Sequence, residues 1–257
     1  KGIVLIYSQY IDGGAVPMAL ALEEMGLTRF GSESYTKPLL KETSSEPIDS
    51  LTMEPESSYK GDDFKQAKYV MITGDKTYSP NNINDIKYLN DENNKYGKNV
   101  KVVIISKAAA EGIDFKNIRQ VHILEPWFNM NRIEQIIGRG VRNLSHCKLP
   151  FEERNVEIFL HGSSLEDSQE ATDLYIYRLA EQKAKKIGKI TRLLKEISVD
   201  CVLNIEQSNF THEKLSQITE NQDIEVTLPN GKKTTVQYGD KPYTDICDYM
   251  DNCDYSC

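Results

Sequence analysis

Two arginines near the end of one predicted helix could bind the phosphates of a nucleotide. Arg139 and Arg142 lie in the string Gln135-Ile-Ile-Gly138-Arg139-Gly140-Val-Arg142, and a helical pattern over residues 131–141 places them on one face. Gly138 is expected to let the backbone approach a neighbour closely. A guanidinium is always charged, and its planar fork matches phosphate oxygens. The string therefore predicts contact with a transferring phosphoryl group, and a pair of surface arginines is the alternative.

A second candidate lies earlier in the chain, directly after an apolar run at residues 100–106. It reads Ser106-Lys107-Ala-Ala-Ala-Glu111-Gly112-Ile113-Asp114. A strand that ends in such a loop puts backbone amides at the carboxyl edge of a parallel sheet, where ligands bind. We expect this loop and the arginines to belong to one site.

The elements that position these residues follow an alternating pattern. Short, continuously apolar runs predict strands covered on both faces, and helical patterns lie between them. The strands are expected at residues 2–8, 69–73, 100–106, 120–124 and 156–160, and the helices at 16–25, 83–90 and 131–141. This alternation predicts an α/β fold with a parallel sheet flanked by helices.

The motifs, in order, resemble the C-terminal RecA-like domain of superfamily 2 helicases. The resemblance covers residues 1–162 and rests on IVLIYSQY, Thr73-Gly74, A-x-E-G-I-D and Q-x-x-G-R-x-x-R. Trp127-Phe128-Asn129 is similar to the W-N-P stretch of the remodeller-like branch, although proline is absent. The region after residue 162, with LYIYRLAEQKAKKI, resembles helicases of large nucleocytoplasmic DNA viruses related to early-transcription and transcript-release ATPases.

The resemblance implies roles for individual residues. Arg139 and Arg142 would contact the γ-phosphate, with Arg142 favoured as the arginine finger, and Gln135 would help to position the attacking water. Gly112, Asp114 and Gly138 would lie at the ATP side. Contacts to the backbone phosphates of a nucleic-acid strand would come from Gln9, Thr73, Gly74, Ser106 and Lys107. Turn-forming hydroxyls are the alternative for Thr73 and Ser106.

Half of a nucleotide site is missing from this sequence. It contains no G-x-x-x-x-G-K-[ST] string, and Asp91-Glu92 lies in a polar stretch rather than after a strand. ATP with Mg²⁺ is therefore expected to bind mainly to an N-terminal RecA-like lobe of the same protein. The chain also begins within the strand-like run GIVLIYS, as an excised fragment would. DNA or RNA and the transcription machinery are the other expected partners, with no membrane.

Residues 163–257 predict an appendage. A long helix is expected from about 169 to 197, followed by a polar link and a hairpin around Pro229-Asn230-Gly231. We expect the apolar side of the helix to face the core, and its basic side to be solvated or to contact phosphates. The basic side comprises Arg178, Lys185, Lys189 and Arg192, and the apolar side Ile176, Ala180, Ala184, Ile187, Ile190, Leu194 and Ile197.

The formal net charge of −8 argues against a nucleic-acid partner at first sight. Residues 31–66, however, carry eight acids and four lysines, and residues 220–257 carry eight acids and three lysines, which leaves the rest of the chain near neutral. The segment 31–66 has little periodicity and predicts a mobile insertion, with packed irregular structure as the alternative.

Five cysteines without a secretory signal predict an intracellular, reducing location, in the cytoplasm of an infected host cell or a virion if the protein is viral. Cys247, Cys253 and Cys257 are expected to be free thiols. Zinc bound with Cys201 or His212 is the alternative.

Two further functions remain open. A non-catalytic RecA-like interaction module in a viral transcription complex would retain the fold without ATP turnover. A mononucleotide-binding α/β enzyme is disfavoured because the chain has no glycine-rich phosphate loop.

Overall fold

The computed structural model describes residues 1–31, 37–42, 45–107, 112–166, 169–208, 210–219 and 222–257. It divides into two compact units. Unit 1 comprises residues 1–126, 133–162 and 227–232, and unit 2 comprises residues 127–132, 163–226 and 233–257.

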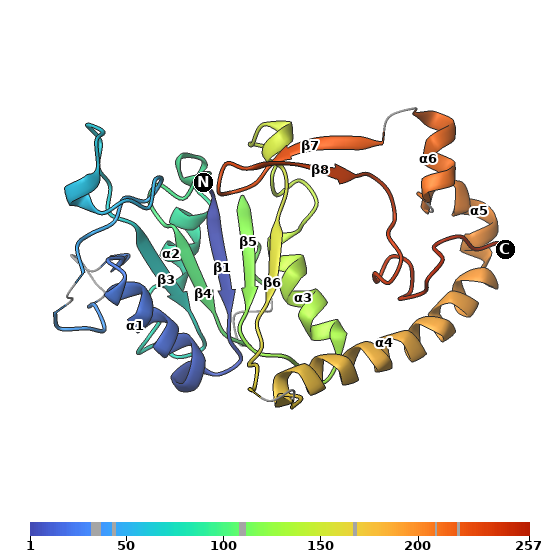
Figure 1. Cartoon of the computed structure of the whole chain (residues 1–257), viewed down its shortest axis with the longest axis horizontal. Helices are drawn as coiled ribbons and strands as arrows, with labels where there is room; N and C mark the ends of the chain where they lie inside the picture. Colours follow the sequence, from blue (N-terminus) through green and yellow to red (C-terminus); the bar gives the residue numbers. More distant parts are fainter. Residues whose placement is uncertain (32–36, 43–44, 108–111, 167–168, 209, 220–221) are drawn as a thin grey trace. The chain divides into compact units, whose positions relative to one another are not determined.

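Unit 1 is built on a six-stranded sheet in which every pair is parallel (Figure 1). The strand order is β2-β3-β4-β1-β5-β6. The bounds are β1 Ile3–Tyr7, β2 Thr28–Arg29, β3 Lys68–Ile72, β4 Val102–Ile105, β5 Ile118–Ile123 and β6 Glu157–Leu160. The five strands predicted from apolar runs are all present. The short strand β2 was not predicted, because two residues are too few for a pattern.

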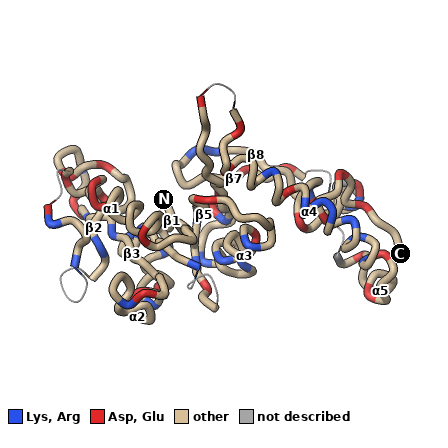
Figure 2. Tube along the Cα trace, turned by 90° about the horizontal axis from the view of Figure 1, so that it is seen from below, with Lys and Arg blue, Asp and Glu red and all other residues tan. Residues whose placement is uncertain are grey.

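Helices cover both faces of this sheet. They are α1 Val16–Glu24, α2 Asn82–Leu89 and α3 Met130–Gly140, each within two residues of its predicted bounds. Figure 2 shows α1 and α2 on opposite faces. Beneath α1, Ala19 and Leu22 pack against Tyr69 and Ile104 in the buried core. The predicted RecA-like α/β class is confirmed, including the long helix and the hairpin that follow the sheet in sequence.

Part of the acidic segment 31–66 lies outside the described residues. In the rest, Asp49 is buried, and its carboxylate accepts backbone N–H groups of Leu51, Thr52 and Lys65 at 2.8–3.1 Å. Residues 45–66 thus form hydrogen-bonded irregular structure, which was the alternative for this segment. Mobility stays a prediction.

Unit 2 is mostly helical. It contains α4 Thr172–Glu196, α5 Val199–Ser208, α6 His212–Ile218, and the antiparallel hairpin strands β7 Asp223–Thr227 and β8 Lys233–Gln237, whose tip belongs to unit 1. The predicted long helix and hairpin are present, whereas the predicted polar link instead forms α5 and α6. No helix in the described residues is long and apolar enough to span a bilayer.

The predicted buried face of α4 is confirmed at Ala180 and Ala184 but was wrong further along the helix. Ala180, Ala184, Gly188 and Arg192 form the buried row, whereas Ile187 and Ile190 are each 63% exposed. Small residues let the C-terminal tail approach, since a Cβ on Gly188 would lie 1.9 Å from the carbonyl oxygen of Asp248. Arg192 tolerates burial because its Nε donates to the Asp248 carboxylate at 2.8 Å.

The prediction that Cys247, Cys253 and Cys257 are free thiols was also wrong. Cys201 is bonded to Cys257, and Cys247 to Cys253, while Cys147 is free and exposed. No group of three or more metal-ligating side chains occurs among the described residues. The tail is therefore fixed to α5 by a disulfide.

Candidate nucleotide and nucleic-acid interface

The arginine segment differs from its prediction at two points. α3 ends at Gly140, so Arg139 lies in the helix and Arg142 beyond it, and the two do not share a helical face. The close approach belongs to Gly140 rather than Gly138. A Cβ on Gly140 would lie 2.6 Å from Val121 Cγ2, whereas one on Gly138 would meet nothing within 4 Å. Gly140 thus seats α3 against β5, and the chain turns there.

Both arginines reach the loop that follows β4. The Arg142 guanidinium pairs with the Asp114 carboxylate, and the two side chains are 47% and 63% exposed. Arg139 Nη1 donates to the carbonyl oxygen of Ile113 at 3.3 Å. Arg139 Nε is buried and has no hydrogen-bond partner among the described residues. The structure therefore brings Asp114, Arg139 and Arg142 together, with donor capacity to spare.

Residues outside the predicted set hold these groups in place. Ser145 Oγ donates to the carbonyl oxygen of Arg142 at 2.8 Å, which fixes the backbone after α3. Asn90, at the end of α2, bonds to both sides of the Asp114 loop: its Nδ2 donates to the Asp114 carbonyl at 2.8 Å, and its Oδ1 accepts from Lys116 N–H at 2.9 Å. Asparagine after a helix is too common a signal for this role to be predicted from sequence.

Other predicted site residues are less constrained. Gln135 is exposed on α3, one turn before Arg139, and Gly138 is partly exposed between them. Gly112 is exposed with φ of +77° and has open space around it. Residues 108–111 of the A-x-E-G-I-D motif, including Glu111, lie outside the described residues.

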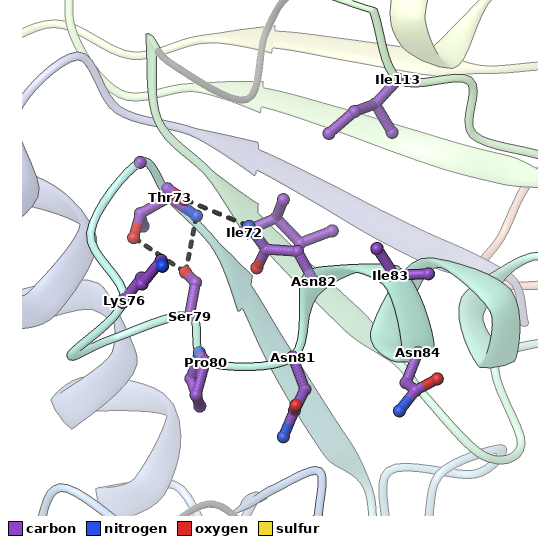
Figure 3. A pocket seen from close by; sticks show the side chains of 11 residues that line it. Ile72, Thr73, Lys76, Ser79, Pro80, Asn81, Asn82, Ile83, Asn84 and Ile113 are labelled. Carbon is purple, nitrogen blue, oxygen red and sulfur yellow. Dashed lines mark hydrogen bonds between the residues drawn. The ribbon is translucent and has the colours of Figure 1, made fainter.

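A pocket of about 620 Å³ opens at the carboxyl end of β3 (Figure 3). Thr73 and Gly74 line it together with Lys76, the start of α2 and Ile113. Thr73 is buried, and its N–H donates to Ser79 Oγ at 2.7 Å, while the two hydroxyl oxygens lie 2.8 Å apart. The Thr73 hydroxyl therefore closes the turn, which was the alternative for this residue. Gly74 and Lys76 are exposed at the pocket.

Ser106 behaves differently from Thr73. It is 2% exposed at the end of β4, and its Oγ has no partner among the described residues. Lys107 beside it is exposed. A buried hydroxyl without a partner costs free energy, so Ser106 is the better candidate for a ligand contact.

The end of β1 is organised by an acid that sequence reasoning did not single out. Glu125, after β5, accepts hydrogen bonds from Ser8 Oγ at 2.6 Å and from Gln9 N–H at 2.7 Å. The backbone of Gln9 is thereby fixed at the same edge of the sheet as Ser106. Glu125 was visible in the sequence only as part of the stretch before α3.

Part of this region is similar to a known protein family. Residues 57–143, which carry Thr73, Ser106, Asp114 and both arginines, match the model of the helicase conserved C-terminal domain. This part of the chain is therefore similar to helicase C-terminal domains. The match does not include β1, although β1 pairs with β4 and β5 inside the same sheet. The sheet therefore includes a central strand that lies outside the matched region.

Proteins similar to this chain occur in large DNA viruses. A protein of Acanthamoeba polyphaga mimivirus, whose name describes an ATP-dependent RNA helicase, is 42% identical over 44% of this chain and 15% of its own length. Nucleoside triphosphatase I of Heliothis armigera entomopoxvirus is 37% identical over 51% of this chain and 20% of its own. The termination factor NPH-I homolog of African swine fever virus is 29% identical over 95% of this chain and 37% of its own length. The chain thus spans well under half the length of these relatives.

Proposed function

We propose that this chain is the C-terminal motor lobe of an ATP-dependent nucleic-acid helicase or translocase. The observation that carries the proposal is the meeting of Arg139 and Arg142 with Asp114 at the carboxyl edge of the sheet, inside the matched helicase domain. In this proposal the lobe donates arginines to an ATP and Mg²⁺ that are bound mainly by an N-terminal lobe. The chain alone would not hydrolyse ATP.

The chemistry follows from the state of the two guanidiniums. Arg142 is half exposed and pairs with one carboxylate, so a more highly charged γ-phosphate could take the place of Asp114 at little cost. Arg139 has an unused Nε donor. A phosphoryl group in transfer carries charge on its equatorial oxygens, which guanidinium donors stabilise. Gln135 would position water, and Gly112 and Gly138 leave room for the nucleotide to approach.

The same edge of the sheet would hold one nucleic-acid strand. Ser106 offers a buried hydroxyl without a partner among the described residues, Lys107 an exposed positive charge, and Gly74 an exposed backbone amide. Thr73 would act by shaping the turn, and Gln9 would add a contact from the end of β1. Contacts of this kind hold phosphates without reading sequence.

Partners and location are proposed from the relatives. The name of the African swine fever virus protein, a termination factor homolog, favours work beside a transcription machinery, on DNA or RNA. We propose an intracellular location in infected cells or virions. The redox state of the four paired cysteines can be measured in both places.

The test is ATP turnover by the full-length protein with single-stranded DNA and RNA as alternative stimulants. The proposal expects turnover to rise when one of them is added, because strand binding and nucleotide binding share the sheet edge. A full-length protein that binds nucleic acid but hydrolyses no ATP would instead be the non-catalytic interaction module.

A further inference from the structure

A second pocket, of about 590 Å³, opens in unit 1 beside the edge strand β2. It lies at the amino ends of the strands, because Thr28 and Lys68, the first residues of β2 and β3, line it. Thr73, at the other end of β3, lies about 16 Å further along the extended chain. The pocket is therefore separate from the site at the carboxyl edge, and its volume suits a small ligand.

Among the described residues, every charged residue that lines this pocket is a lysine: Lys65, Lys68 and Lys98. Lys98 Nζ donates to the Asp63 carboxylate at 2.6 Å. Lys65 and Lys68 form no ion pair within the part of the chain that the structure describes. Because no carboxylate lines the pocket to balance these charges, an anionic ligand such as a phosphate is favoured there.

Two aromatic side chains line the same pocket. Phe30, just after β2, and Tyr88, near the end of α2, contact each other with ring centroids 5.2 Å apart and planes tilted by 54°. Tyr88 is 51% exposed, so part of its ring is accessible to a ligand. Sites for nucleic acid combine such rings, on which bases stack, with cations that hold the phosphates.

The remaining polar residues separate a nucleotide from an acidic peptide. The Asn99 side chain lines the pocket and makes no hydrogen bond within the described ranges, although its backbone N–H donates to Asn94. An amide offers both a donor and an acceptor, as the edge of a base requires. A carboxylate of a peptide would use the lysines and leave the amide and the rings without a role.

We propose that this pocket binds one nucleotide unit, with its phosphate at Lys65 and Lys68 and its base against Tyr88. The unit is either a free nucleotide or part of a single strand, since both present the same phosphate and base. This site goes beyond the proposed motor function, because it lies at the opposite edge of the sheet and requires no ATP hydrolysis.

The experiment is photo-crosslinking of the full-length protein to 4-thiouridine. One arm uses a short single-stranded RNA that carries this base, and the other uses free 4-thiouridine monophosphate. Mass spectrometry of the digested protein then locates each crosslink. We expect crosslinks at Tyr88 or Phe30, and the arm that gives them identifies the source of the nucleotide.

Paired lysine variants test the phosphate contacts. Lys65→Ala with Lys68→Ala should lower crosslinking at Tyr88 and Phe30 by at least about threefold, because two cations are lost. Lys65→Arg with Lys68→Arg keeps the charge and should retain the crosslinks. Circular dichroism checks that each variant is folded.

Lys41→Ala with Lys60→Ala is the matched control. It removes two exposed lysines of the segment 31–66 that do not line the pocket, and it should crosslink like the wild type. Crosslinks confined to the carboxyl edge, near Thr73 or Ser106, would overturn this proposal and leave the motor function standing. Crosslinks at Tyr88 that the loss of Lys65 and Lys68 does not change would also overturn it. Crosslinks at Tyr88 with none at the carboxyl edge would support the pocket and count against the strand contacts proposed for the motor.

Discussion

The Arg142 side chain is oriented by an exposed ion pair that another anion can replace. Its partner Asp114 is on the protein's own loop, and both side chains are about half exposed. Exposed ion pairs contribute about 0–1 kcal/mol, so this pair orients the arginine and yields readily to a stronger anion. The fixed part is the backbone, because Ser145 Oγ bonds to the Arg142 carbonyl.

The buried Ser106 hydroxyl can be tested by removing it. Because its hydroxyl is buried without a partner, Ser106→Ala should leave the free energy of unfolding unchanged or slightly raise it. If the hydroxyl binds a strand phosphate, the same variant should weaken single-strand binding by about 2- to 10-fold. Thermal unfolding and fluorescence anisotropy measure the two effects.

Ser79→Ala is the control for Ser106. Its Oγ accepts the Thr73 N–H at 2.7 Å, so its loss should lower stability by about 1 kcal/mol. A Ser106→Ala protein that is destabilised as much as Ser79→Ala, with unchanged strand binding, would show that Ser106 is only structural.

At the scale of elements, sequence patterns predicted the central strands and helices. Short, continuously apolar runs are typical of buried parallel strands, and helical spacing of apolar residues is typical of the helices between them. They failed where the deciding partner is distant in sequence. The buried side of α4 depends on Gly188 meeting the tail at Asp248, and Arg192 is buried only because that carboxylate neutralises it. Likewise, the sequence does not indicate that Thr73 forms hydrogen bonds with Ser79, or that the buried Ser106 hydroxyl lacks a partner among the described residues. Both depend on side-chain geometry.

The two glycines of α3, Gly138 and Gly140, differ in the space around them. Gly140→Ala should destabilise the protein by about 1–3 kcal/mol, because the new methyl would lie 2.6 Å from Val121. Gly138→Ala meets open space and should stabilise α3 by up to about 1 kcal/mol. Chemical denaturation of both variants measures the difference. Equal effects would contradict the assignment of Gly140 as the residue that seats α3 on the sheet.

At the scale of the whole molecule, the two units differ in how they are held together. Unit 1 has a strand-pairing network and a continuous apolar core. Unit 2 relies on the buried Arg192–Asp248 pair and on disulfides, one of which joins Cys201 to Cys257 across 56 residues. A cross-link over that span stabilises by about 4 kcal/mol through the unfolded chain.

Reduction should therefore act on one unit only. Adding a reductant should increase hydrogen exchange of residues 243–257 and of α5, while the amides of β1 and β4 stay protected. Cys201→Ser in the oxidised protein should reproduce part of this effect. Equal loss of protection in both units would contradict the division of stabilising interactions described above.

The central claim is that this lobe supplies an arginine to a phosphoryl transfer, and single-turnover ATP hydrolysis by the full-length protein tests it most directly. Arg142→Ala should lower the rate by about 10³-fold or more with little change in ATP binding. Arg178→Ala, which removes another exposed arginine paired with a carboxylate, should hydrolyse ATP at the wild-type rate. A wild-type rate for Arg142→Ala, or an equal loss in Arg178→Ala, would contradict the account.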